Sequence, residues 1–474
     1  MKKALFFTIL LLLCLNISAA AQEVEIDIYK VPQCEDDAVL MSVNEGIKEA
    51  FSEKVTDAWD DMATSVKLYP EIKINEDDLY ELYAMTVFDN PRYFYAGRSY
   101  SYNLMPGGYV GTLKLKYTVD DKGEIEKTLA EIDKATEEIL LYIDPDMTDF
   151  EKIIAVHDYM INNYVYDITD ADQTMLIMLD KVGVCAAYSE AFQHMMNTLG
   201  IEGALVRSEA MGHIWNMVKL DGEWYHIDVT WDDPVPDCVA VVRHEHVLLS
   251  DNGIKALGHY GFVSPYEATS SRYDNAAWRD DSGMVTVDGV MYHVEGGSLI
   301  DEDGNVIYEK LDGGDGRWSI GGGYVFTGGI YAGVCRVNNI IYFNTDKGIY
   351  SYSPKDGSVE TVLKKDGICG IYADKNTLIY NRFDIEESTF VKGGELRVAD
   401  FVMAKPCYGK DEVTVRLYND YDCPVWIIKG GEECDIERVE PKSFATAEFE
   451  GKEIEIFVWK ENMEPVTKKV MANE

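Results

Sequence analysis

One cysteine and one histidine-rich segment of the sequence carry the residue types of a thiol enzyme. Cys185 lies in the segment GVCAAYSEAFQHMMNTLG, and the stretch MGHIWNMVKLDGEWYHIDVTWDD follows it from Met211 to Asp233. The second stretch holds two histidines, three tryptophans and five acidic residues. A cysteine thiolate can attack a carbonyl group, an imidazole can move the proton, and a carboxylate can orient the imidazole. The two segments are therefore candidates for one site of nucleophilic catalysis.

The histidine-rich stretch is typical of a β-hairpin. Asp221-Gly222 is a two-residue turn signal between two runs of aromatic and β-branched residues. Counting outward from a tight turn makes His213 and Asp228 diagonal neighbours, close enough for the imidazole to donate a ring N–H to the carboxylate. A loop of three to five residues would break this register. The predicted face carries His213, Trp215, Met217, Trp224, His226, Asp228 and Thr230.

The segment around Cys185 predicts a helix that begins near the cysteine. Apolar residues recur at helical spacing, and Gly200 is suited to be the C-cap. A cysteine at a helix N-terminus lies at the positive end of the helix dipole, and a nearby imidazolium adds to this effect, so both stabilise the thiolate. Gly183 permits a close approach of the backbone, which would help the Cys185 N–H point at a developing oxyanion. The apolar residues with this spacing are Tyr188, Phe192, Met195, Met196 and Leu199.

These segments resemble a known family. The strings GVCAAY, GHIWN and WYHIDVTW, in this order and spacing, are similar to the transglutaminase-like core of many bacterial secreted proteins, a branch of the papain-like thiol enzymes. The resemblance covers residues 146–265, and it implies that Cys185 is the nucleophile, His213 the general acid/base and Asp228 the group that orients the histidine. Ile214 departs from the family, which more often has alanine there, and the apolar string MLIML before Cys185 is also unusual.

The sequence predicts an α+β protein built from several domains. The core resembles the papain-like or transglutaminase-like fold, with a helical N-terminal extension before it and β-rich segments after it. Thr148 through Glu151 has the capping-box pattern, so a helix that leads into the core should begin there. The predicted domains are a signal peptide (1–21), an α+β N-terminal extension (22–145), the catalytic core (146–265), a β-rich propeller-like repeat region (266–400) and a small Ig-like β-sandwich (401–474).

Repeated strand patterns mark the β-rich part. The strings DGVMYHVEGGSLIDEDGNVIYE and NNIIYFNTDKGIYSYSPKDG match at an offset of 50 residues, with Tyr292 and Tyr342 in register. Two or three propeller-type blades would not close a propeller, which usually needs at least about four, so a partial or irregular β-domain is expected. From residue 401 onward, short alternating strings such as VTVRLYN and EIEIFVWK favour the β-sandwich.

The N-terminus is typical of a secretory signal peptide. Lys2 and Lys3 precede an apolar run, and Ala19-Ala20-Ala21 fits the small-residue cleavage rule, so cleavage after Ala21 is predicted. No later stretch has enough consecutive apolar residues to span a bilayer. We therefore expect a secreted or cell-surface-associated protein without membrane insertion. The net charge of −41, which becomes −43 without the two lysines, argues against nucleic acid or anionic membrane as a partner.

Other candidate sites are weaker. His244 and His246 have the spacing of two residues on one strand face, as zinc ligands sometimes do, but no cluster of partners is evident, and His157 is expected to pack or cap. The sequence has neither a Walker motif nor a glycine-rich dinucleotide motif. We therefore expect no cofactor and no metal. Of the cysteines, Cys423 and Cys434 are the nearest pair and could bridge, although connectivity does not follow from sequence.

The leading hypothesis is a secreted cysteine-dependent enzyme that acts on amide bonds of peptides or proteins through a thioester acyl-enzyme. Water as the acceptor makes it a peptidase or amidase, which we favour over an amine acceptor and transglutaminase-type transfer. Substrates of either reaction include peptides, proteins and the stem peptides of peptidoglycan. A third hypothesis is a non-catalytic cell-surface binding or scaffolding protein whose β-modules bind a ligand. It predicts full function after Cys185→Ala, whereas the enzyme hypothesis predicts the reverse.

Overall fold

A computed structural model gives the positions of most of the chain. It describes residues 39–40, 44–144, 147–169, 174–279, 283–320, 323–326, 332–399, 401–403, 407–408, 412–430, 435–450, 453–461 and 466–471. The predicted signal peptide and Cys434 lie outside the described residues. The chain divides into two compact units, one of Met1–Thr128, Ala204–Ile214 and Tyr260–Tyr266 and one of Leu129–Gly203, Trp215–His259 and Glu267–Glu474. No helix of the described residues is long and apolar enough to cross a membrane.

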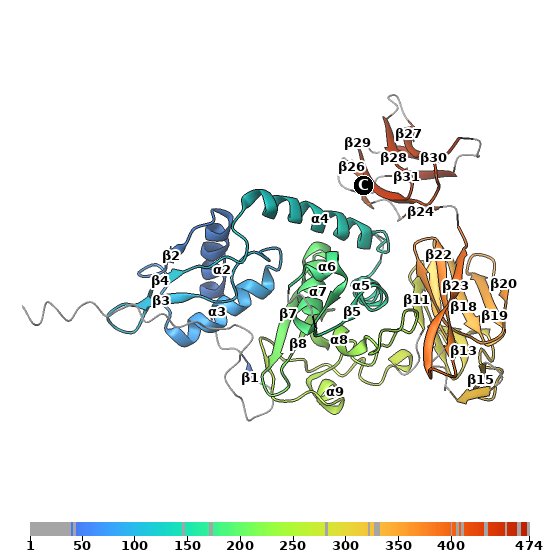
Figure 1. Cartoon of the computed structure of the whole chain (residues 1–474), viewed down its shortest axis with the longest axis horizontal. Coiled ribbons are helices and arrows are strands. Elements are labelled where there is room, and N and C mark those ends of the chain that lie inside the picture. Colours follow the sequence, from blue (N-terminus) through green and yellow to red (C-terminus); the bar gives the residue numbers. More distant parts are fainter. Residues whose placement is uncertain are drawn as a thin grey trace, which may run out of the picture. The chain divides into compact units, whose positions relative to one another are not determined.

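The first unit combines helices with short strands (Figure 1, blue). The second of its two long helices ends at Asp89, directly before Asn90-Pro91. Asn75 starts that helix through a capping box with Asp78. The strands β2, β4 and β3 form an antiparallel sheet. The elements are α2 (Glu45–Asp60), β2 (Ser65–Lys67), α3 (Glu76–Asp89), β3 (Ser101–Leu104), β4 (Val110–Lys114), β7 (Gly203–Ser208) and β10 (Val263–Ser264), which pairs in parallel with β1 (Val39–Leu40).

The second unit begins with a group of helices around a hairpin (Figure 1, green). The predicted capping box is confirmed, because Thr148 Oγ1 accepts from the Glu151 N–H and Glu151 accepts from the Thr148 N–H. The predicted C-cap is also confirmed, since Gly200 has a left-handed φ of 71°. The elements are α4 (Lys122–Leu140), α5 (Asp149–Asn163), β5 (Val165–Tyr166), α6 (Ile177–Asp180), β6 (Val182–Gly183), α7 (Cys185–Leu199), β8 (His213–Leu220), β9 (Glu223–Ile227), α8 (Val229–Asp232) and α9 (Asp251–Ala256); α4 and β8 each continue from the first unit.

Antiparallel sheets of similar design follow the helical part. Tyr292 pairs with Val285, and Tyr342 pairs with Cys335, so the predicted offset of 50 residues holds strand for strand. The propeller-like geometry stays a prediction. The sheets are β11 to β14 (Met284–Val287, Val290–Glu295, Ser298–Asp301, Val306–Tyr308), β15 and β16 (Arg317–Ile320, Gly323–Phe326), β17 to β20 (Val334–Val337, Ile340–Thr345, Gly348–Ser353, Ser358–Lys364) and β21 to β23 (Ile368–Asp374, Thr377–Asp384, Thr389–Arg397).

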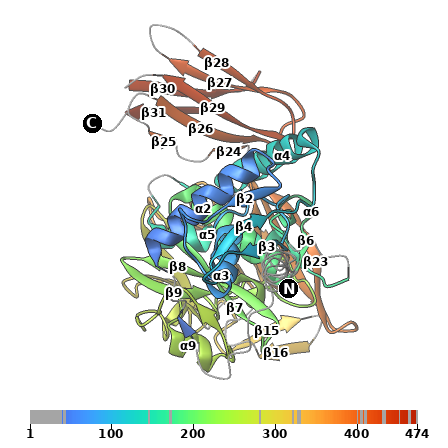
Figure 2. The same cartoon turned by 90° about the vertical axis from the view of Figure 1, so that its left-hand side faces the viewer.

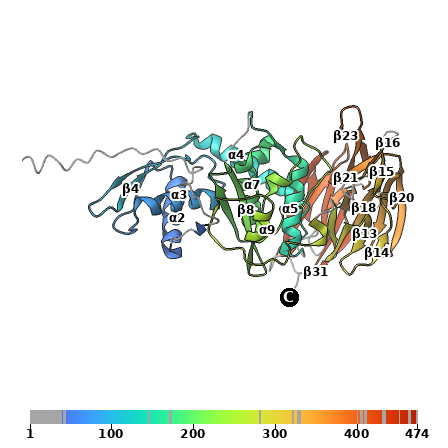
Figure 3. The same ribbon diagram turned by 90° about the horizontal axis from the view of Figure 1, so that it is seen from below.

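Helix α5 faces these sheets within the second unit (Figure 3). The Asn163 side chain at the end of α5 donates to the hydroxyl of Tyr372 on β21 at 2.7 Å. The hydroxyl of Tyr142 donates to Asp374 on the same strand at 3.1 Å. Partly buried hydrogen bonds thus join the helical part and the first β-rich part of the unit.

The C-terminal strands form two sheets with one shared apolar core (Figure 2, top). Val415 and Ile427, from different sheets, are both fully buried in that core. Two packed antiparallel sheets agree with the predicted β-sandwich, while the Ig-like topology stays a prediction. Cys423 is a free thiol, and Cys434, the other cysteine of the possible pair, lies outside the described residues. The strands are β24 (Phe401–Met403), β25 (Cys407–Tyr408), β26 (Glu412–Asn419), β27 (Val425–Gly430), β28 (Asp435–Val439), β29 (Ser443–Glu450), β30 (Glu453–Trp459) and β31 (Val466–Met471).

Candidate active site

Cys185 is the first residue of α7, as the sequence predicted. The N-cap residue Val184 gives no side-chain hydrogen bond to the helix, so the first N–H groups of α7 are not used by a cap. A Cβ on Gly183 would come within 2.8 Å of the Ala187 Cβ and 2.7 Å of the Ile177 Cδ1, so the main chain lies close to these two side chains, and the predicted role of Gly183 in orienting the Cys185 N–H stays a prediction. The Cys185 thiol is half-buried. It therefore combines access to solvent with the positive end of a helix dipole.

The hairpin has the turn that its sequence predicts. Asp221 and Gly222 have φ angles of 54° and 86°, the positive values of a type I′ turn. Leu220 pairs with Glu223, so the predicted two-residue loop and register are confirmed. The prediction fails at its far end, because Thr230 lies in α8 and not on the strand face.

The hairpin is joined to helix α7 on one side. Asn216 on β8 donates from Nδ2 to the main-chain oxygen of Ser189 on α7 at 3.1 Å. On the other face, Trp215 Nε1 donates to His226 Nδ1 at 3.0 Å, so the proton of His226 lies on Nε2, which contacts Asp251 at 2.8 Å. Burial lowers the pKa of His226 despite this carboxylate. His226 is thus a neutral, structural histidine, and the other histidine of the stretch remains the candidate acid/base.

The three predicted site residues lie at element boundaries. Cys185 begins α7, His213 begins β8 and is buried, and Asp228 directly follows β9. Cys185 and Asp228 belong to the second unit, whereas His213 belongs to a segment of the first. Tyr166 pairs with Gly183. Burial is the main cause that raises the pKa of Tyr166, and the charges of Cys185 and Asp228 add to it, which indicates that Tyr166 lies near both groups. The pairing of His213 with Asp228 stays a prediction.

Both carboxylate oxygens of Asp228 accept hydrogen bonds. Oδ1 accepts from the Trp231 N–H at 3.1 Å, which makes Asp228 the N-cap of α8. Oδ2 accepts from His259 Nε2 at 2.8 Å. Asp228 is 1% exposed, and these contacts fix its carboxylate in one orientation.

His259 is a residue of this site that the sequence analysis missed. Its ring lies between Trp215, with centroids 4.7 Å apart, and Trp231, with centroids 4.3 Å apart. Trp231 is 39% exposed, so one wall of this aromatic layer reaches solvent. His259 follows Asp228 by 31 residues and lies in an irregular segment, so no sequence periodicity could predict the contact between them.

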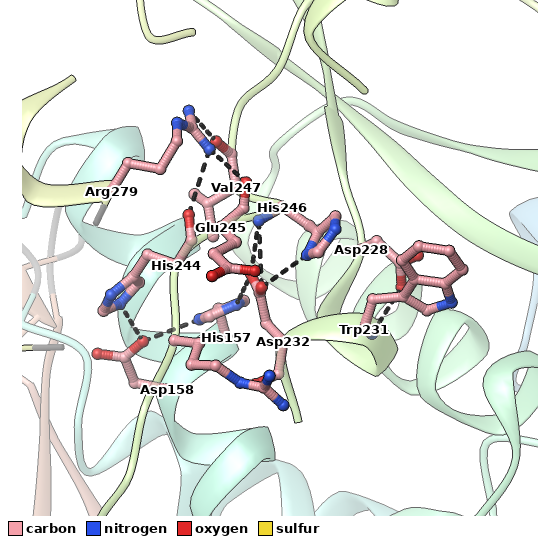
Figure 4. A network of polar contacts seen from close by, with 11 residues as sticks. His157, Asp158, Asp228, Trp231, Asp232, His244, Glu245, His246, Val247 and Arg279 are labelled. Carbon is pink, nitrogen blue, oxygen red and sulfur yellow. Dashed lines mark hydrogen bonds and ion pairs between the residues drawn. The ribbon is translucent and has the colours of Figure 1, made fainter. Parts of the chain in front are cut away.

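A second group of histidines and carboxylates surrounds Asp232 (Figure 4). Asp232 is fully buried and accepts from His246 Nδ1 at 2.9 Å and from His157 Nε2 at 3.2 Å. His157 Nδ1 and His244 Nε2 each contact Asp158 Oδ1 at 2.9 Å. The expectation that His244 and His246 lie on a strand without a partner cluster is therefore wrong. His157 is buried as expected, with both ring nitrogens on carboxylates.

The pKa values of this second group are strongly shifted. Burial alone would lower the pKa of His157, but hydrogen bonds with Asp158 and Asp232 outweigh it and raise the pKa to about 9. Burial would raise the pKa of Asp158, but the charge of His244 and the two imidazole hydrogen bonds lower it to about 2. The pKa of Asp232 is lowered too, since the hydrogen bonds from His157 and His246 outweigh burial. The group is an alternating row of imidazoles and ionised carboxylates.

Arg279 holds the main chain of this second group in place. Its guanidinium donates to the main-chain oxygens of His244 at 3.2 Å, Glu245 at 2.7 Å and Val247 at 2.7 Å (Figure 4). Arg279 is 7% exposed, so these charge-assisted hydrogen bonds are shielded from water. The segment that carries His244 and His246 is thereby fixed although it has no regular secondary structure.

Among the hydrogen bonds of the described residues, a third carboxylate, Asp233, has a phenol and not an imidazole as its partner. The Tyr188 hydroxyl donates to Asp233 Oδ2 at 2.5 Å, and Asp233 is 3% exposed. Burial is the main cause that raises the pKa of Asp233 to about 7, and the charge of Asp237 adds to it. Tyr188 follows Cys185 by three residues in α7, so the two side chains lie on the same face of that helix.

Comparison with known proteins gives one family. The model of the transglutaminase-like superfamily matches residues 138–229, a span that includes Cys185, His213 and Asp228. No curated protein matches the sequence.

Solved structures with some similarity include the crystal structure of a TGase and that of a candidate cysteine protease from Cytophaga hutchinsonii, each 18% identical to this chain, with TM-scores of 0.21 and 0.19. The matches cover 34% and 28% of this chain and 49% and 55% of theirs, so the chain spans about half the length of these two structures. The extracellular domain of a one-component system from B. thetaiotaomicron is 8% identical over 56% of this chain and 44% of its own, with a TM-score of 0.17. By the family match, residues 138–229 of this α+β protein form a domain of the transglutaminase-like superfamily.

Proposed function

We propose that the protein is a cysteine-dependent enzyme that acts on amide bonds of peptides or proteins. The observation that carries the proposal is a half-exposed thiol at the start of α7 in the same compact unit as the buried, doubly hydrogen-bonded carboxylate of Asp228. The family match spans both residues and His213 between them. Members of this superfamily are usually cysteine-dependent enzymes.

In the proposed mechanism, Cys185 attacks the carbonyl carbon of an amide, and its proton passes to His213. The imidazolium then gives the proton to the leaving amine as the C–N bond breaks, and a thioester acyl-enzyme remains. Asp228 stabilises the imidazolium and sets its tautomer. The helix dipole at Cys185 and its main-chain N–H favour the thiolate and the developing oxyanion. The two-residue turn of the hairpin supports the predicted reach from His213 to Asp228.

The acceptor that resolves the thioester decides between two reactions. Water regenerates the thiol and releases a carboxylic acid, which makes the protein a peptidase or amidase, the reaction we favour. An amine acceptor makes it a transglutaminase-type acyltransferase, and the half-exposed Trp231 beside Asp228 is the feature that favours this second candidate, since an indole can exclude water. Trp215 is buried and hydrogen-bonded to His226, so it acts in the core and not at the entrance.

The setting of the enzyme is part of the proposal. We propose export through a signal peptide cleaved after Ala21, and substrates among peptides, proteins and peptidoglycan stem peptides. The sheets from β11 to β23 would form a partial propeller-like module, and β24 to β31 an Ig-like one, each suited to bind a cell-surface ligand or to act as a spacer. If these modules carried the function alone, the protein would be a non-catalytic scaffold, and Cys185→Ala would leave it fully functional.

The deciding experiment is the rate of Cys185 alkylation by iodoacetamide against pH, read by mass spectrometry of the Cys185 peptide. Cys238 is an internal control in the same digest, since burial raises its pKa to about 12. We expect Cys185 to react well below the free cysteine pKa of about 8.5, and His213→Ala to lose that low-pH reactivity. Equal profiles of Cys185 in the wild type and in His213→Ala would contradict the proposal. Profiling of peptide substrates with and without added amines would then separate hydrolysis from acyl transfer.

A further inference from the structure

Three side chains of the second unit bring together atoms that could ligate a metal ion. His157 Nδ1, His244 Nε2 and a carboxylate oxygen of Asp158 all lie within 4.8 Å of one another. The two nitrogens are each 2.9 Å from Asp158 Oδ1. Figure 4 shows the carboxylate between the two imidazoles, which come from different parts of the chain, helix α5 and the irregular segment before α9.

The two rings have the separation that a shared ion would require. Their centroids are 5.2 Å apart, and their planes differ by 27°. With zinc–nitrogen bonds of about 2.0–2.1 Å, an imidazole centre lies about 3 Å from the ion, so two imidazoles at a tetrahedral angle have centres about 5 Å apart. The observed ring spacing is therefore that of two imidazoles on one ion.

The support around these ligands is that of a metal site. The second nitrogen of His157 is held by the carboxylate of Asp232 at 3.2 Å, the arrangement that orients a ligating histidine. Asp232 is in turn held by the main-chain N–H and the ring of His246. Arg279 fixes the main chain at His244. His157 and His244 are 0% and 1% exposed, so the surrounding residues hold both rings in their present orientation.

A cavity of about 120 Å³ opens beside the third ligand. It lies between α5 and strands β11, β17 and β21, and Asp158 is one of its lining residues, with 26% of its side chain exposed. Water or a small ligand in this space could complete the coordination sphere. The remaining walls are largely apolar, which strengthens the attraction between a cation and the carboxylate.

We propose that His157, Asp158 and His244 bind one divalent transition-metal ion of the zinc class. Two imidazoles and one carboxylate suit Zn²⁺ or Co²⁺, whereas Ca²⁺ and Mg²⁺ take oxygen ligands. The ion would cross-link α5 to the segment that leads to α9, next to Asp232. The site is separate from the thiol chemistry, and it departs from the sequence-based expectation of no metal.

The test is isothermal titration of the full chain with Zn²⁺ after treatment with a chelator. Cys185 and the other accessible thiols are first alkylated, so that they cannot bind the metal. Titration with Co²⁺ in parallel, read by its visible absorption, reports ligand geometry directly and does not depend on activity. Variants His244→Gln and Asp158→Asn remove one ligand each. His293→Gln is the matched control, since His293 is a buried histidine of β12 outside the proposed set.

We expect one Zn²⁺ per chain, a Co²⁺ absorption band, and no heat with Mg²⁺ or Ca²⁺. His244→Gln and Asp158→Asn should each weaken Zn²⁺ binding by at least about 100-fold, and His293→Gln should leave it unchanged. If His244→Gln does not fold, the near-isosteric Asp158→Asn decides alone. No binding by the wild type, or binding that both ligand variants retain, would overturn the proposal, because any metal found would then be held elsewhere.

Discussion

Two carboxylates four residues apart, Asp228 and Asp232, are both buried, and each accepts an N–H from an imidazole. Their surroundings differ. Asp228 lies beside the half-exposed Trp231 and near Tyr166, which is also near Cys185. Asp232 is enclosed by two histidines and by the His246 main chain.

The comparison shows that a strongly shifted pKa does not by itself locate an active site. The pKa of His157 is raised to about 9 and that of Asp158 is lowered to about 2, yet both belong to the group around Asp232, in which the hydrogen bonds of the described residues join imidazoles and carboxylates and no cysteine. What distinguishes Asp228 is its surroundings, because Trp231, whose N–H it accepts, is 39% exposed, and Tyr166 lies near both Asp228 and Cys185. Solvent exposure and a nearby thiol therefore identify the candidate site better than a shifted pKa does.

The largest effect should come from Asp228→Asn. The variant keeps the shape of the side chain but loses the charge that, in the proposed mechanism, stabilises the imidazolium of His213 and selects its tautomer. We expect kcat on an amide substrate to fall about 10³–10⁴-fold. The thermal midpoint should fall much less than in Asp232→Asn. A variant that retains wild-type turnover would remove Asp228 from the mechanism.

Asp232→Asn should act on stability instead. It removes one partner of a fully buried charged group and leaves His157 and His246 without their carboxylate. Breaking such a pair costs about 3–5 kcal/mol in the free energy of unfolding. Urea unfolding of the wild type and the variant measures this directly. Turnover per folded molecule should be nearly unchanged, and a selective loss of kcat in a stable variant would refute the division between the two carboxylates.

The sequence predicted the parts of the site that local chemistry determines. Asp221-Gly222 specifies its turn through positive φ angles, and the turn sets the hairpin register. The helix that begins at Cys185 follows from its apolar spacing and from Gly200. The alternation of strand residues wrongly placed Thr230 on the strand face, because the sequence pattern continues past the end of β9 without a break. The signal for the change was Asp228 itself, since aspartate is a favoured N-cap.

The missed residues are joined to the site only by tertiary packing. His259 contacts Asp228 across 31 residues, and His157 contacts Asp232 across 75. A single histidine in an irregular segment, or one inside an amphipathic helix, has no spacing that points to its partner. Only the arrangement of α5, α8 and the segment after α9 brings these side chains together, and no local sequence preference encodes that arrangement.

His259 offers a finer test of how Asp228 is held. His259→Ala removes the N–H that binds Asp228 Oδ2, and a hydrogen bond to a charged group contributes about 1.5–3 kcal/mol. We expect kcat to fall about 10–100-fold with little change in KM. His259→Gln, whose amide can donate from a similar position, should recover part of the loss. Equal activity of the two variants would show that His259 only fills space between Trp215 and Trp231.

The smallest effect concerns Asp233, the carboxylate that a phenol binds. Burial raises its pKa to about 7 in the folded protein, whereas an unfolded aspartate titrates near about 3.9. Between these values the unfolded chain has lost the proton that the folded chain keeps, so the stability that Asp233 contributes is complete below about pH 4 and is lost as the pH rises to about 7. The slope of the unfolding free energy against pH is at most about 1.4 kcal/mol per pH unit.

Asp233→Asn should remove this pH dependence, so the variant's stability relative to the wild type should rise by about 1 kcal/mol between pH 5.5 and 6.5 in urea unfolding. The charged neighbours Asp237, Arg243 and His157 are present in both proteins, so the difference isolates Asp233, and parallel stability curves would mean that its carboxyl is ionised despite its burial.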